Sequence, residues 1–449
     1  SGPGNGRVSI LEGIRQKAGK SIAVSYMPGP GREAKTWTVV PAKYLTHTEN
    51  GKPFPGLHAG YFNNIRLSGK PAVTRTDATV NFSWTLFTPD PAITQPFYSV
   101  RWTGILKPPT AGKYKIGLDG NDGYRLYIND SLIIDNWIKR SYNTLLCDFT
   151  FERDKTYALR VEFFEPVGNA HIKLVWNAET KTDWNVKIQE AVTAARQSDM
   201  AVVVAGIHEG EFQDRAMLSL PGHQEELIQQ VAATGKPVVI VLVGGSAITM
   251  SNWLSKVNSV LDVWYPGEEG GHAVADVLFG DYNPAGRLPV TFPLHEAQLP
   301  LVYNHKPTGR GDDYYNLSGL PLFPFGYGLS YTTFEYSEPV LDKRTIAPGE
   351  TATISCMVKN TGKADGDEVV QLYITDKLAS GARPVMELKG FQRVRLKAGE
   401  SRQITFAITP GMLSMLNADM KSVIEPGAFT IMIGASSRDI RLKEELVVE

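Results

Sequence analysis

The chain has 449 residues, of which 46 are Lys or Arg and 47 are Asp or Glu, so its formal charge is −1. This balance, without a basic run, excludes the electrostatic surface that binds nucleic acid or an anionic membrane, and we expect neither as a partner. The longest apolar stretch, residues 237–243, is far shorter than the roughly 20 residues of a membrane-spanning helix. The length predicts about two to four domains.

The first predicted elements are a helix and a strand. Ile10, Leu11 and Ile14 recur at helical spacing, and Gly19 predicts the end of this helix. The run Ile-Ala-Val-Ser-Tyr at 22–26 then predicts a strand. Because so small a unit cannot bury its own apolar face, we expect it to dock on a sheet formed later in the chain.

From about residue 37 to residue 177 the helical period disappears. Short runs of alternating apolar residues are separated by turn residues, which is typical of an antiparallel β-sandwich. The predicted core-facing sets are Tyr124, Leu126 and Ile128; Cys147, Phe149 and Phe151; Leu159, Val161 and Phe163; and Ile172, Leu174 and Trp176.

Helices and apolar strands alternate after residue 184. The first helix should bury Val186, Ile188, Ala191, Val192 and Ala195. Strands are predicted at 201–206, 237–245 and 259–264, and helices at 222–233, 247–253 and 270–279. This alternation predicts a parallel sheet covered by helices on both faces. From residue 333 the two-residue alternation returns and predicts a second, smaller sandwich, with Cys356 in its core.

The predicted fold class is therefore multidomain. An α/β sandwich (residues 1–34 and 181–332) is interrupted by an inserted antiparallel β-sandwich (residues 35–180) and followed by an immunoglobulin-like β-sandwich (residues 333–449). An insertion at a surface loop costs little stability, because the entropy of loop closure grows only logarithmically with loop length.

The best candidate for chemistry is the charged loop that follows the strand 201–206. It carries Glu209, Glu211, Asp214 and Arg215. Ligands of such sheets bind beyond the carboxyl ends of the strands, and a Glu kept protonated there can act as a general acid. On this pattern either Glu fits that role, with Asp214 and Arg215 as a local ion pair that shapes the loop. The alternative is that all four charges are solvated loop residues.

Several strings in and after this loop match one known enzyme family in order and spacing. They are Glu-Phe-Gln-Asp-Arg at 211–215, Leu-Ser-Leu-Pro-Gly at 218–222, Gln-Glu-Glu-Leu-Ile at 224–228, and the segments 264–271, 279–293 and 324–334. They resemble the family-three glycoside hydrolases, whose acid/base loop has Glu-Gly-x-Asp-Arg, Leu-x-Leu-Pro and Gln-x-x-Leu-Ile. The resemblance assigns the acid/base to Glu211. Phe212 departs from the usual Gly, which leaves Glu209 as a competitor.

The two predicted sandwiches also resemble domains that occur in this family. Residues 358–362, 366–373 and 388–391 resemble its fibronectin-type-III-like domain. Residues 114–128 resemble a protective-antigen-type module, which in some β-glucosidases is inserted in the α/β-sandwich domain and walls the aglycone side of the pocket.

The module resemblance bears on two further sites. Trp137, on a predicted loop, is a candidate for stacking on a sugar, and the alternative is a half-buried rim residue. In calcium-dependent adhesins a consecutive Asp pair of this module binds the metal, whereas this chain has Asn121 and Asp122. We therefore expect no metal, and no cofactor.

The resemblances imply the carboxyl-terminal part of a retaining β-glucosidase that hydrolyses terminal β-D-glucosyl residues of glucosides or oligosaccharides. Retention needs a second carboxyl about 5–5.5 Å from the acid/base. In this family that nucleophile is an Asp on an amino-terminal barrel, a fold of about 250 residues. We expect it on an absent barrel domain or a second chain, and no activity without it. β-Xylosidase-type specificity and a non-catalytic carbohydrate-binding or adhesive assembly stay open as alternatives.

Overall fold

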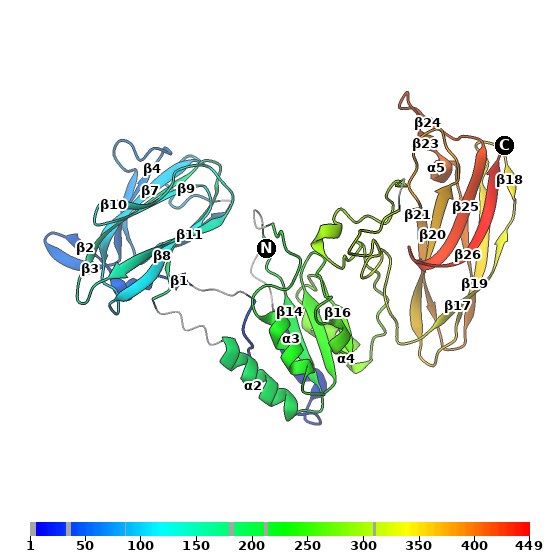
Figure 1. The fold of residues 1–449 in the computed structure, drawn as a ribbon, viewed down its shortest axis with the longest axis horizontal. Coiled ribbons are helices and arrows are strands. Elements are labelled where there is room, and N and C mark those ends of the chain that lie inside the picture. Colours follow the sequence, from blue (N-terminus) through cyan, green and yellow to red (C-terminus); the bar gives the residue numbers. More distant parts are fainter. Residues whose placement is uncertain (1–5, 33–36, 86, 179–183, 211–213, 309–310) are drawn as a thin grey trace. The chain divides into compact units, whose positions relative to one another are not determined.

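The computed structural model describes all residues except 1–5, 33–36, 86, 179–183, 211–213 and 309–310. The chain divides into two compact units (Figure 1). The first comprises Ser1–Arg32, Ile188–Ile207 and Ala216–Glu449, and the second comprises Glu33–Lys187 and His208–Arg215. The domain boundaries expected near residues 34 and 180 fall on residues outside the described part and stay predictions. No described helix is long and apolar enough to cross a membrane.

The second unit contains two antiparallel sheets. One has the order β1-β13-β8-β11 with β6 beside β13, and consists of β1 (Thr38–Val39), β6 (Asn81–Thr85), β8 (Gly112–Gly120), β11 (Asn143–Phe151) and β13 (Asn169–Trp176). The other has the order β10-β9-β12-β7-β2-β3, with β4 on β7 and β5 on β4. Its strands are β2 (Leu45–Glu49), β3 (Lys52–Pro55), β4 (Leu57–Phe62), β5 (Val73–Asp77), β7 (Tyr98–Leu106), β9 (Gly123–Ile128), β10 (Ser131–Asn136) and β12 (Tyr157–Glu165).

The alternation predicted for these strands is confirmed in the core of this unit. The predicted core-facing residues of β9, β12 and β13 are all buried, and Phe151 of β11 is buried with them. Cys147 and Phe149 are only half-buried and pack against the edge of the same core. Alternate residues of a strand point to opposite faces, so a strict two-residue pattern is enough to identify the inward face.

The first unit contains a three-stranded parallel sheet of order β14-β15-β16, formed by β14 (Ala201–Gly206), β15 (Val238–Val243) and β16 (Ser259–Asp262). Its helices are α1 (Ile10–Ala18), α3 (Gln224–Ala232), α4 (Gly270–Phe279) and, from Ile188 onward, α2 (Trp184–Arg196). The amino-terminal helix docks on this later part of the chain, as predicted. The contact is close: a side chain at Gly13 of α1 would meet the Gly271 carbonyl oxygen of α4 at 2.0 Å.

Three local predictions for this region are wrong. Residues 22–26 form no strand, because they pair with no strand of the described sheet. Residues 247–253 form no α-helix: the Thr249 N–H donates to Leu218 O at 3.0 Å instead of bonding within a helix, and only a 3-10 turn, η2 (Leu254–Lys256), follows. On α2 the inward residues are Ile188, Val192 and Ala195, whereas Val186 is exposed.

The carboxyl-terminal sandwich has two main sheets. They are β17 (Phe334–Leu341), β19 (Ala352–Asn360) and β22 (Ser401–Ile408) in one, and β18 (Thr345–Ile346), β26 (Asp439–Val448), β25 (Gly427–Ser436), β20 (Gly366–Asp376) and β21 (Glu387–Leu396) in the other. Shorter elements are η1 (Ala42–Tyr44) in the second unit and η3 (Glu296–Gln298), α5 (Pro410–Leu413), β23 (Met415–Leu416) and β24 (Ser422–Val423) in the first. Cys356 lies in the core of this sandwich, as predicted.

A buried ion pair fastens this sandwich to the α/β part. Arg287 Nη2 lies 2.9 Å from Glu368 Oε2, and the two side chains are 10% and 3% exposed. The hydroxyl of Tyr336 donates to the other carboxylate oxygen at 2.8 Å. Gln371 adds a neutral link by donating to Gly326 O at 3.0 Å. The Arg287–Glu368 and Gln371–Gly326 contacts join residues of different predicted domains, which are 81 and 45 positions apart in sequence.

Candidate functional site

The charged loop begins where β14 ends, at the sheet edge to which β15 and β16 also run. Glu209 is half-buried at its start and His208 is exposed. Glu211, the predicted acid/base, lies outside the described residues. Asp214 is exposed and Arg215 is half-buried. The predicted local ion pair of these two residues, and their role in shaping the loop, stay predictions.

Gln224 fixes the start of the loop relative to its end. Its side chain lies at the first residue of α3 and is almost fully buried. The Gly206 N–H donates to Gln224 Oε1 at 2.8 Å, and Gln224 Nε2 donates to Gly206 O at 2.9 Å and to Pro221 O at 2.8 Å. One amide group thus bonds to the last residue of β14 and to the turn before α3. Sequence reasoning saw this Gln only as part of a string and assigned it no role.

A second anchor holds the later part of the loop. The Leu218 N–H donates to the carboxylate of Glu296, and Leu218 O accepts from Thr249 N–H at 3.0 Å. Burial by itself would raise the pKa of Glu296, but backbone N–H groups, including that of Leu218, outweigh burial and lower the pKa below its usual value. An ionised Glu296 therefore stays bonded to the loop at neutral pH.

The end of β16 contributes a carboxyl that sequence reasoning missed. Burial raises the pKa of Asp262 to about 6, although its Oδ1 accepts from the Trp264 N–H at 3.3 Å. Trp264 has φ +49°, a left-handed conformation that is rare and strained for a bulky side chain. Strain and shifted pKa values are both common at functional sites. The carboxyl end of this sheet thus has an anchored loop, a strained Trp264 and an Asp262 whose pKa is raised.

Trp137 lies in the second unit and is half-buried, immediately after β10. The Arg125 guanidinium lies 4.6 Å from the centre of its ring, and Phe164 packs at 4.8 Å with the ring planes 60° apart. One face of the Trp137 ring is therefore already covered by a cation, and a sugar would have to stack on the uncovered part of the ring. Its substrate-binding role stays a prediction.

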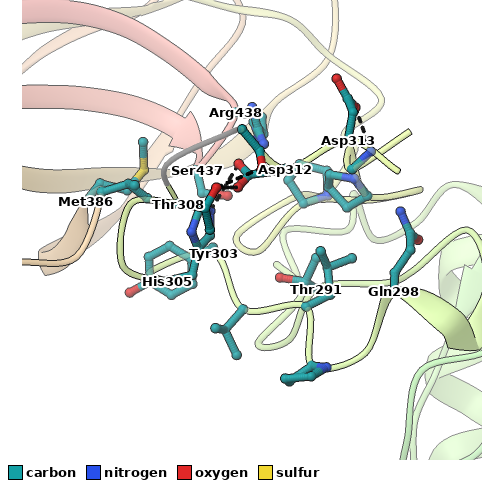
Figure 2. A pocket seen from close by; sticks show the side chains of 18 of the residues that line it. Thr291, Gln298, Tyr303, His305, Thr308, Asp312, Asp313, Met386, Ser437 and Arg438 are labelled. Atoms are coloured by element: carbon teal, nitrogen blue, oxygen red, sulfur yellow. Dashed lines mark hydrogen bonds and ion pairs between the residues drawn. The ribbon is translucent and has the colours of Figure 1, made fainter. Parts of the chain in front are cut away.

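A cavity of about 570 Å³ lies between the segment 291–324 and the carboxyl-terminal sandwich. Figure 2 shows His305, Thr308 and Asp312 gathered opposite Ser437 and Arg438. Its polar groups bond largely to one another: Thr308 Oγ1 donates to Gly311 O at 2.7 Å, and His305 Nε2 lies 3.5 Å from Asp312 Oδ2. The ring of Tyr303 is stacked on Phe325 at 4.1 Å. The residues that line the cavity include none of the described residues of the charged loop, so we do not assign the cavity to the loop.

Comparison with known proteins assigns the fold to a family. Residues 1–331 match the model described as the glycosyl hydrolase family 3 C-terminal domain. The chain belongs to glycosyl hydrolase family 3. Residues 368–437 match the fibronectin type III-like domain, so this family member is a mostly β, multidomain chain that ends in a fibronectin-like domain.

Relatives of this family 3 chain are named as glycosidases. It is 42% identical over 57% of its length to the periplasmic β-glucosidase of Salmonella typhimurium, and covers 35% of that protein. It is 31% identical over 99% of its length to the xylan 1,4-β-xylosidase of Xylanibacter ruminicola, and covers 52% of it. It superposes on the crystal structure of the β-glucosidase of Kluyveromyces marxianus with a TM-score of 0.66 and 27% identity, covering 99% of this chain and 56% of that one. The chain thus spans between a third and somewhat over half of these proteins.

The place where the family 3 chain departs from an Asp pair has a distinctive geometry. Asp122 is 3% exposed, and the carboxyl of Glu165 is fully buried. Asn121 Nδ2 donates to Asp122 Oδ2 at 2.8 Å and to Asn169 O at 2.7 Å. Burial, and then the Glu165 carboxyl, raise the pKa of Asp122 to about 7. No group of three or more His, Cys, Asp or Glu side chains that could hold a metal occurs among the described residues.

We predict that the second unit loses stability as the pH rises. The pKa of Asp122 is higher in the folded protein than its ordinary value of 3.8, so the folded state holds this proton more tightly. The stabilisation that the Asp122 proton gives to the folded state is complete below about pH 4 and is lost as the pH rises through about 7. Between pH 5 and pH 8, hydrogen exchange at Val161 and Leu174, corrected for intrinsic rates, should lose up to about a hundredfold of its protection. Asp122→Asn should abolish this slope, whereas exposed Asp135→Asn should keep it; equal slopes in the two variants would refute the assignment.

Proposed function

We propose that this chain is the carboxyl-terminal part of a retaining β-glucosidase that hydrolyses terminal β-D-glucosyl residues and in which Glu211 is the general acid/base. The observation that carries the proposal is the position of the charged loop, directly after β14 in a segment that matches the family's C-terminal domain. In sequence, Glu211 comes soon after Gly206, the anchored last residue of β14, and ligands of α/β proteins bind beyond the carboxyl ends of such strands.

The proposed reaction has two steps. In the first, an Asp of the remaining part of the protein attacks the anomeric carbon while Glu211 gives its proton to the departing glycosidic oxygen. In the second, Glu211 as carboxylate removes a proton from water, and that water displaces the Asp from the sugar. The proton returns to Glu211, and the anomeric configuration is retained.

The other domains receive subsidiary roles. Residues 35–180 would be a protective-antigen-type module inserted between the two parts of the α/β sandwich, residues 1–34 and 181–332. Trp137 would contribute to the aglycone wall through the part of its ring that Arg125 and Phe164 leave uncovered. The partner of the chain would be an amino-terminal barrel, as a domain of the same protein or as a second chain.

The proposal is tested with an aryl β-glucoside. We expect this chain alone to give no turnover above the buffer blank, and the chain joined to the remainder of its protein to turn over the substrate. Substantial turnover by the chain alone would overturn the division of the site. Carbohydrate binding without turnover by the longer protein would favour a non-catalytic assembly.

β-Xylosidase specificity is the second candidate, because the xylan 1,4-β-xylosidase relative matches nearly the whole chain. The ratio of kcat/KM on aryl β-glucoside to that on aryl β-xyloside decides between the two. A ratio above one supports the glucosidase, and a ratio below one supports the xylosidase.

A further inference from the structure

Three arginines lie on the outer face of the larger sheet of the second unit. They are Arg101 of β7, Arg160 of β12 and Arg125 of β9, on strands that are neighbours in the sheet. Their sequence neighbours are buried in the core, and alternate residues of a strand point to opposite faces, so the arginines point outward. Their side chains are 38%, 34% and 30% exposed, respectively. The strand register places Glu162 of β12 between Arg101 and Arg125.

The charges on this face do not balance. Arg101 Nε donates to Glu162 Oε1 at 2.9 Å, and the Glu162 side chain is only 6% exposed. Arg125 Nη1 and Arg160 Nε each lie 3.9 Å from a Glu162 oxygen, which is beyond hydrogen-bond range. Arg125 has a second carboxylate, because its Nε donates to Asp135 Oδ1 at 2.9 Å. Among the described residues no further carboxylate pairs with these guanidinium groups, so three positive charges face two negative ones.

The guanidinium of Arg160 is the one without a hydrogen-bonded carboxylate. Its Nε is buried and makes no hydrogen bond with any residue that the structure describes. The guanidinium carbon lies 3.8 Å from the centre of the Tyr127 ring, and this cation–π contact holds the group in place. A buried donor without an acceptor costs free energy, and a charged donor costs more. This face therefore has a fixed cation that lacks an acceptor.

The groups beside Arg160 suit a polar ligand. Arg101 Nε and Arg160 Nε lie 2.9 and 3.9 Å from the same oxygen, Glu162 Oε1, so the two guanidinium groups are neighbours. In the part of the chain described here, the Nη groups of both arginines have no hydrogen-bond partner. Thr103 and Tyr127 are the cross-strand partners of Arg160, and each adds a hydroxyl to the same face.

We propose that Arg101 and Arg160 bind the carboxylate of an acidic sugar, a hexuronic acid residue of a glycan. The surplus of positive charge fits an anion, and the forked N–H groups of a guanidinium match a planar carboxylate. The hydroxyls of Thr103 and Tyr127 fit a ligand that carries hydroxyls of its own. A glycan also agrees with membership of a glycosyl hydrolase family. The proposal concerns β7, β9 and β12 alone and does not depend on the role of Glu211.

Titration calorimetry of the longer protein with trigalacturonic acid tests the proposal. We expect the acid to bind at least about tenfold more tightly than its methyl ester, which is uncharged and otherwise alike. Raising the salt concentration from about 0.05 to about 0.5 M should weaken binding of the acid only. Equal affinities of the acid and the ester would overturn the proposal. Tighter binding of a sulfated neutral trisaccharide would also overturn it, because the recognised anion would then be a sulfate.

A matched pair of substitutions locates the binding site. Arg160→Gln should lower the affinity for trigalacturonic acid by at least about tenfold and leave the affinity for the methyl ester unchanged. Arg153→Gln, on the exposed turn between β11 and β12, should change neither affinity. Unchanged binding of the acid by Arg160→Gln, or an equal loss in both variants, would contradict the site.

An NMR titration gives a readout that needs no substitution and so does not depend on how well a variant folds. The Nε–H resonances of Arg101 and Arg160 should shift as trigalacturonic acid is added, because their guanidinium groups bond to its carboxylate. The Nε–H resonance of Arg153 should stay in place. Unshifted resonances of Arg101 and Arg160 at a concentration that saturates the calorimetric signal would place the ligand elsewhere and overturn the proposal.

Discussion

In the longer protein, Glu211→Ala is expected to lower kcat on alkyl β-glucosides by about 10²–10⁴-fold, the usual contribution of a general acid. An alkoxide leaves only when it is protonated, so these substrates depend fully on the carboxyl. The dinitrophenolate of a dinitrophenyl β-glucoside leaves without a proton. The rate of the first step on this substrate should therefore fall by less than about tenfold. Rates of the two steps, measured separately by burst kinetics, give this comparison.

Two controls make the result specific to Glu211. Azide, which needs no deprotonation to attack the anomeric carbon, should restore turnover of the dinitrophenyl substrate and yield a β-glycosyl azide. Glu209→Ala, two residues earlier on the same loop, should keep the leaving-group dependence of the unsubstituted enzyme. The assignment fails if Glu211→Ala lowers kcat on all substrates by the same factor, or if azide restores turnover in Glu209→Ala instead.

The second large effect concerns the buried pair of Arg287 and Glu368. Arg287→Gln should destabilise the first unit by about 3–5 kcal/mol, because it leaves a buried carboxylate without its cation. The surface pair of Arg402 and Glu400 has the same 2.9 Å separation, but the Arg402 side chain is 52% exposed. Arg402→Gln should therefore cost less than about 1 kcal/mol. Native-state hydrogen exchange at Leu372 and Ile433 in the core of the sandwich measures both variants.

The loss from Arg287→Gln should also depend on pH. Burial raises the pKa of Glu368, and Arg287 opposes that rise. Without Arg287, the pKa of Glu368 in the folded variant rises further. The folded variant then keeps a proton on Glu368 over a pH range in which the unfolded chain has already lost it. Its stability is greatest at low pH and falls as the pH rises through the folded pKa. A loss that is the same at pH 5 and pH 8 would mean that the carboxylate finds another partner.

Much of the architecture could be predicted from the chain of residues. The two-residue alternation identified core positions such as Leu126, Val161 and Leu174, because side-chain direction in a strand is a local property. The strings after residue 211 identified the family, and the match of residues 1–331 confirms it. The apolar runs of β14 and β15 were equally clear, since strands buried in a parallel sheet need apolar residues throughout.

The failures share one cause. Whether residues 22–26 become a strand depends on a neighbour that offers a ladder, and the described sheet offers none. Residues 247–253 have a helical pattern, but Thr249 bonds to Leu218 across space and fixes another conformation. Period and propensity describe a segment by itself, whereas strand pairing and long-range hydrogen bonds depend on what lies beside it.

The sequence by itself determined the family and the inward faces of most β-sandwich strands, and it predicts the loop on which the acid/base should lie. Those features follow from composition, period and motif strings, each of which is local. Only the tertiary structure decided how that loop is held: the Gln224 side chain bonds to Gly206, and the Glu296 carboxylate bonds to Leu218. Hydrogen-bond partners and burial are relations between distant segments, and a pattern along the chain does not contain them.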